Sequence, residues 1–140
     1  MPIPGLVTIE SRLDPRETAD KLAAAVVARG MAVLARIDHA KAAADAGLAL
    51  RPTEVLLFGA AKAGTPLMQS AQTIGIDLPL KALVWQDEGG KTWISTNDPR
   101  WLAARHDAAQ GHEAVLAAMT AALAAVAAEA AGRTSADDAG

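Results

Sequence analysis

The turn from Gly59 to Thr65 is where this chain most clearly places chemically useful groups together. It follows the apolar run 55–58, which predicts a strand, and it carries Lys62 just before a predicted helix start. The first turn of a helix exposes backbone N–H groups that attract negative charge. Gly64, Thr65 and Lys62 therefore predict a site for a small anionic or carbonyl ligand.

His39 stands at a comparable junction, after another predicted strand and beside Asp38. An imidazole exchanges protons near neutral pH, and the positive end of a helix favours its neutral form. Lys81 begins a later strand and would add a cation. We therefore expect one polar pocket, bordered by His39, Lys62, Gly64, Thr65 and Lys81.

Three classes of function remain open for these residues. The first, which we favour, is a domain that binds a small molecule in this pocket. The second is an enzyme that uses His39 as acid or base, with Lys81 or Arg36 as the oxyanion partner, although the chain has no Ser-His-Asp or paired-carboxylate signature. The third is a structural module that only mediates assembly.

Each of these residues also has a purely structural explanation. Glycines 59 and 64 would supply positive φ in a tight turn. His39 would be a hydrogen-bonding side chain without chemistry, and Glu54 and Lys81 would form an ion pair in the sheet.

Two further patterns bear on cofactors and metals. Gly59 and Gly64 have the spacing of a phosphate-binding P-loop, but Thr65 stands where that motif requires lysine, so we expect no nucleotide and no other cofactor. His106 and His112 are six residues apart across Gly111, which is not the spacing of a helical metal pair. Both are expected to be exposed, and no metal site is expected.

The apolar periodicity predicts an α+β fold: a single domain with about five strands in a mostly antiparallel sheet, helices mainly on one face and a long C-terminal helix. Strands are predicted at 6–11, 31–37, 54–58, 80–86 and 91–96. The continuous apolar run 54–58 predicts a central strand buried on both faces. A hairpin at Gly89-Gly90 favours this fold over a parallel sheet, and Trp85 and Trp93 are expected to pair across it.

Helix starts are marked by capping residues. Asp14-Pro15, Asp38, Thr65-Pro66 and Asp98-Pro99 each predict one, and the last helix is expected from about 112 to 131.

Composition restricts the class of protein further. The 140 residues carry a net charge of −3, no cysteine and only four aromatic residues, so nucleic acid is an unexpected partner. The first residues lack the pattern of a signal peptide, and Glu129 interrupts the alanine-rich segment 114–131. We expect a cytoplasmic protein without a membrane span, with its domain at 1–131 and a disordered tail at 132–140.

Several segments resemble one family of bacterial and archaeal proteins. These are Arg36 to Ala40, Arg51 to Gly59, Lys62 to Gln69, Leu78 to Lys81 and Asn97 to Pro99. In this order, over roughly residues 5 to 107, they resemble the domain of unknown function 302 (DUF302) family. The resemblance implies a compact α+β domain that forms homodimers, and it brings no agreed activity, cofactor or catalytic residue. An exposed Trp101 would mark the dimer contact.

Overall fold

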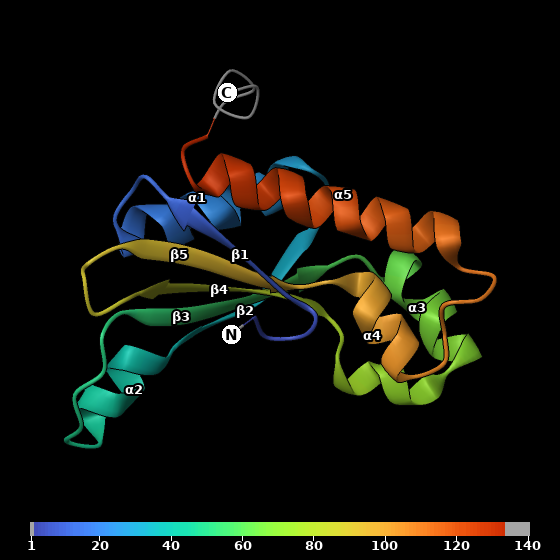
Figure 1. Ribbon diagram of the computed structural model, residues 1–140, viewed down its shortest axis with the longest axis horizontal. Coiled ribbons are helices and arrows are strands. Elements are labelled where there is room, and N and C mark those ends of the chain that lie inside the picture. Colours follow the sequence, from blue (N-terminus) through green and yellow to red (C-terminus); the bar gives the residue numbers. More distant parts are fainter. Residues whose placement is uncertain (1, 134–140) are drawn as a thin grey trace.

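The computed structural model describes residues 2–133, which form an antiparallel five-stranded sheet with helices around it (Figure 1). The strand order is β1-β5-β4-β3-β2, and every neighbouring pair is antiparallel. The α+β prediction is therefore confirmed, and the parallel alternative is excluded. In chain order the elements are β1 Leu6–Ser11, α1 Pro15–Ala28, β2 Ala32–Asp38, α2 His39–Asp45, β3 Thr53–Gly59, α3 Ala61–Ser70, the 3-10 helix η1 Gln72–Ile76, β4 Leu80–Gln86, β5 Thr92–Asn97, α4 Pro99–Arg105 and α5 Glu113–Ala130.

Capping and turn residues in the sequence account for the positions of most of these helices and strands. The Asp14 carboxylate accepts a hydrogen bond from the Glu17 N–H at 2.8 Å, and the Asp38 carboxylate accepts one from the Lys41 N–H at 2.9 Å. These bonds satisfy N–H groups that a helix start otherwise leaves free. The β4–β5 hairpin is also confirmed, with the Trp85 and Trp93 rings stacked 6.2 Å apart.

Helices α1 and α5 cover one face of the sheet (Figure 1). The residues that point toward them are fully buried, among them Leu56, Phe58 and Val84. Val55 and Leu57 alternate with these and lie on the opposite face, where they are half-buried. The prediction that this strand is buried on both faces was wrong, because α1 and α5 cover only one face and α2, α3 and α4 lie beyond the ends of the sheet.

The helix that follows Gly59 begins earlier than the sequence predicted. It starts at Ala61, with Ala60 as a cap that makes no side-chain hydrogen bond, and Pro66 lies inside it. Thr65 is therefore not the N-cap. The glycines also differ from expectation, since neither Gly59 nor Gly64 is among the described residues with positive φ.

The end of the described chain is attached to β1. Arg133 donates hydrogen bonds to the Glu10 carbonyl from Nε at 3.3 Å and from Nη2 at 3.1 Å. The rest of the tail expected at 132–140, residues 134–140, lies outside the described residues.

Candidate functional site

The two strand-to-helix junctions predicted to form one pocket lie at opposite ends of the sheet. β2 runs antiparallel to β3, so that Asp38, just before His39, pairs with Glu54, whereas Gly59 pairs with Ala32. Strands advance by about 3.4 Å per residue, which puts the ends of β3 about 20 Å apart. The prediction of a shared pocket was wrong, because both junctions follow a strand but the two strands point in opposite directions.

The expected residues accordingly separate. His39 is exposed as the first residue of α2, while Lys62 and Thr65 are exposed on α3. Lys81 lies on β4 opposite Leu57, and its amino group donates to the backbone carbonyls of Asp77 at 3.2 Å and Pro79 at 3.0 Å. Of the five residues, Gly64 lines an apolar groove to which the other four do not contribute.

That groove, which we call the junction groove, occupies about 720 Å³ between α3, the first half of α5 and the edge of the sheet. Gly59 lines it from the end of β3, Gly64 from α3, and Ala118 and Met119 from α5. The remaining lining residues are Arg29 to Ala32, Leu34, Ala60, Ala61, Ala63, Met68, Leu78 to Leu80, Val115 and Ala122. Its walls are apolar, in contrast to the polar pocket expected at this turn.

Small residues keep the junction groove open. A Cβ atom built on Gly64 would contact Leu78 Cδ1 at 3.5 Å and Met68 Cε at 3.9 Å, and one on Gly59 would contact Pro79 Cβ at 3.9 Å. These are ordinary contact distances, so a side chain at either position would occupy space that glycine leaves empty. These glycines therefore leave space beside the groove, and they are not required there for an unusual backbone conformation.

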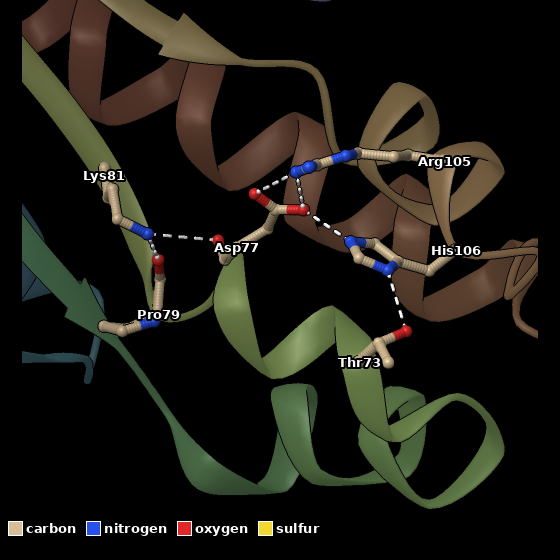
Figure 2. A network of polar contacts seen from close by, with 6 residues as sticks. All are labelled: Thr73, Asp77, Pro79, Lys81, Arg105 and His106. Carbon is tan, nitrogen blue, oxygen red and sulfur yellow. Dashed lines mark hydrogen bonds and ion pairs between the residues drawn. The ribbon is translucent and has the colours of Figure 1, made fainter.

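A polar network lies next to the wall of the junction groove (Figure 2). His106 Nε2 is 2.6 Å from Asp77 Oδ2, and His106 Nδ1 is 2.9 Å from the Thr73 hydroxyl. Arg105 Nη1 donates to both carboxylate oxygens of Asp77, at 3.0 and 2.9 Å. We call these four side chains the Asp77 network. Since Leu78 and Pro79 follow Asp77 directly, the network fixes that part of the groove wall to the end of α4.

Electrostatics in this region follow from burial and these contacts. Burial opposes ionisation of Asp77, but the hydrogen bond from His106 and the charge of Arg105 outweigh it and lower the pKa of Asp77. Burial also lowers the pKa of Lys81, against the opposing charge of Asp77. Asp77 and Lys81 both form hydrogen bonds that hold the loop before β4.

His106 was predicted to be exposed, and that prediction was wrong: its side chain is only 9% exposed. Its partners, Thr73 and Asp77, lie 33 and 29 residues earlier in the chain. No periodicity within the C-terminal segment reveals such contacts. The order Thr-His-Asp is that of a proton relay, but none of the three side chains lines the junction groove, so the geometry assigns them a positioning role beside it.

A second groove, of about 640 Å³, is polar and lies at the other end of the sheet, near His39. Arg36 lines it, but its guanidinium already binds Glu54 at 2.8 Å and Asp20 at 3.1 Å. The hydrogen bond with Glu54 raises the pKa of Arg36 despite some burial. Arg36 is thus not free to stabilise an oxyanion beside His39.

The ion pair expected between Glu54 and Lys81 is absent, because the two side chains lie on opposite faces of the sheet. Glu54 lies on the helix-covered face of the sheet, where it binds Arg36, and Lys81 alternates onto the other face. For metals, residues 2–133 contain no group of three or more His, Asp or Glu side chains arranged to hold an ion.

One helix in residues 2–133, α5, is long and apolar enough to cross a membrane by length and composition. Here it packs on α1 through a buried stripe that includes Leu116, Leu123 and Val126. This stripe is the kind of contact made by a core helix of a folded domain.

Comparison with known proteins yields sequence relatives in Brucella. A 115-residue segment, 82% of this chain, is 48% identical to the "Fluoride-specific ion channel FluC 1" of Brucella suis biovar 1 (strain 1330), covering 45% of that protein. The protein of the same name from Brucella abortus biovar 1 (strain 9-941) gives the same identity and 43% coverage. The chain thus spans less than half the length of the curated relatives it matches.

A solved structure shares the fold. The crystal structure of an uncharacterized conserved DUF302 protein from Bacillus stearothermophilus superimposes with a TM-score of 0.80, at 21% identity, over 91% of this chain and 99% of that one. The family model for "Domain of unknown function DUF302" matches residues 7–126. Together with the sheet and helix order, this match shows that the chain belongs to the DUF302 family.

Proposed function

We propose that this DUF302 domain binds a small, largely apolar molecule in the junction groove. The observation that carries the proposal is a groove of about 720 Å³ whose lining contains one charged side chain, that of Arg29. Binding sites for small molecules are typically 300–1,000 Å³ in volume and lined mainly by apolar side chains. The proposal keeps the binding role expected from the sequence and changes the chemistry of the ligand.

The alternatives have less support. The polar groove near His39 is lined by acids and bases that include the Arg36 ion pairs, so a charged ligand there would compete with bonds already formed. An acid–base role for His39 lacks both oxyanion partners expected for it, since Lys81 lies toward the other end of β3 and Arg36 is paired.

The test is to fill the junction groove from α5. Ala118 is exposed and lines the groove, so Ala118→Trp should fold normally and block binding. Ala117→Trp is the matched control, because Ala117 is equally exposed on the same helix and does not line the groove.

Native mass spectrometry of protein purified from its own host, and binding of an apolar fluorescent probe, provide the measurements. We expect bound ligand and probe fluorescence in wild type and Ala117→Trp, and loss of both in Ala118→Trp. Equal binding by the two variants would reject the junction groove as the site.

A role beside a fluoride channel is a second candidate, favoured by the 48% identity to Brucella proteins of that name. More than half of each of those proteins lies outside the matched segment. We therefore assign this domain an accessory role and not conduction. The measurement is growth in fluoride of a host strain lacking the gene. Unchanged fluoride tolerance would remove this candidate and leave the groove proposal untouched.

A further inference from the structure

Among the described residues that line the junction groove, Arg29 alone carries a charge. It follows α1 directly, as the C-cap residue, and is exposed. Within residues 2–133 its guanidinium forms no hydrogen bond or ion pair. An arginine without a partner beside an apolar cavity presents up to five N–H donors to whatever enters.

Three cations of the sheet and its connections differ from Arg29 in this respect. Arg36 binds Asp20 and Glu54, Arg105 binds Asp77, and the Lys81 amino group donates to two carbonyls. The fold therefore neutralises or engages these cations and leaves Arg29 available at the groove.

We infer that the ligand of the junction groove is a single-chain amphiphile with an anionic head, such as a fatty carboxylate, whose head meets Arg29 and whose chain lies along the apolar walls. The inference rests on the proposed function and adds the chemical class of the ligand. The argument is charge complementarity. A neutral apolar ligand would form no ion pair with Arg29, and a cationic amphiphile would be repelled by it.

The apolar walls set most of the affinity. The chain would pack against Met68 from α3, Val115 and Met119 from α5, and Leu78 from the loop before β4. Each methylene removed from water contributes a free energy equivalent to about a fourfold change in Kd. The exposed position of Arg29 limits the gain from the ion pair to roughly two- to fivefold.

Isothermal titration with monomeric decanoate, decanol and decylamine tests the inference in wild type and in Arg29→Gln. In wild type we expect decanoate to bind about two- to fivefold more tightly than decanol, and decylamine most weakly. Arg29→Gln should remove the difference between decanoate and decanol. Arg100→Gln, which changes net charge equally at an exposed position away from the groove, should preserve it.

The outcomes separate the two proposals. If decanol and decanoate bind equally in wild type and Ala118→Trp abolishes both, the groove is a ligand site but the anionic head is wrong. If neither binds, the amphiphile is wrong, and the groove proposal then depends on native mass spectrometry of wild type and Ala118→Trp.

A bilayer arm distinguishes a free amphiphile from a membrane lipid with a similar head. We expect wild type and Arg29→Gln to sediment with phosphatidylglycerol vesicles to the same extent. Binding to vesicles without binding to monomeric decanoate would overturn the inference.

Discussion

Asp77 is the residue at which three segments of the chain meet. Its side chain joins His106 and Arg105 at the end of α4, and its backbone carbonyl accepts a hydrogen bond from Lys81 on β4. Its side chain is 16% exposed, so these bonds are only partly screened by water. Loss of its charge would leave His106 and Arg105 with a neutral and therefore weaker acceptor.

We predict that Asp77→Asn lowers the free energy of unfolding at pH 7 by roughly 1.5–3 kcal/mol, the range for hydrogen bonds to charged groups. The lowered pKa of Asp77 means that its stabilisation is fully present above the ordinary value of 3.8 and disappears as pH falls through the lower, folded-state value. Urea unfolding from pH 7 to pH 2 measures this. The difference between wild type and Asp77→Asn should shrink at the acid end.

Asp45→Asn serves as the control for this series, because Asp45 is exposed and, within residues 2–133, pairs only with Lys41 four residues away on α2. We expect it to cost less than about 0.5 kcal/mol. A cost for Asp77→Asn as small as this, or independent of pH, would show that the Asp77 network does not stabilise the fold.

At this scale the sequence predicts chemistry poorly. Arg29, His106 and Asp77 owe their environments to residues distant in the chain, and none belongs to a local motif. Gly64 lines a groove, but an apolar one and not the polar pocket predicted for it. Lys62 and Thr65 were assigned by proximity in sequence to Gly64, but on α3 they point elsewhere.

Individual helices and strands are better determined by local sequence. Asp14-Pro15 and Asp98-Pro99 begin α1 and α4 as expected, and the hairpin residues place β4 and β5. The start of α3 was misplaced because Pro66 resembles a first-turn proline, whereas here five helical residues precede it. Sequence periodicity also failed to show that β3 has one covered and one open face, since both faces are apolar.

The two faces of β3 make a prediction at adjacent positions. Leu56 is fully buried beneath the helices, while Leu57 is half-buried on the open face. We expect Leu56→Ala to lower the free energy of unfolding by about 2–5 kcal/mol and Leu57→Ala by clearly less, because only the first leaves a cavity in the core. Thermal and urea unfolding of the isolated domain measure both. Equal losses would mean that the second face is also covered in solution.

For the molecule as a whole, the open face of the sheet is the surface most suited to self-association. Val55, Leu57 and Leu83 lie in its centre, with Ile37 on the edge strand beside them. Trp85 and Trp93 stack nearby, and their indole N–H groups already bond Ser95 and Asp87. Trp101, the dimer contact expected from the sequence, is 41% exposed, but its ring packs on Gly5 away from this patch.

We predict that the protein is a homodimer that pairs these open faces, consistent with the dimer implied by the family resemblance. In a two-fold interface a patch on one protomer contacts the same patch on its partner. An apolar patch can pair with itself in this way, whereas a patch of one charge would repel its copy. Leu83→Asp should therefore give a folded monomer, because it places a carboxylate at the centre of the patch.

Val27→Asp is the control, since Val27 is 62% exposed on α1 and away from this face. Sedimentation equilibrium at micromolar concentration should return twice the monomer mass for wild type and Val27→Asp and the monomer mass for Leu83→Asp. A wild-type monomer, or a dimer that survives Leu83→Asp, would place the contact elsewhere.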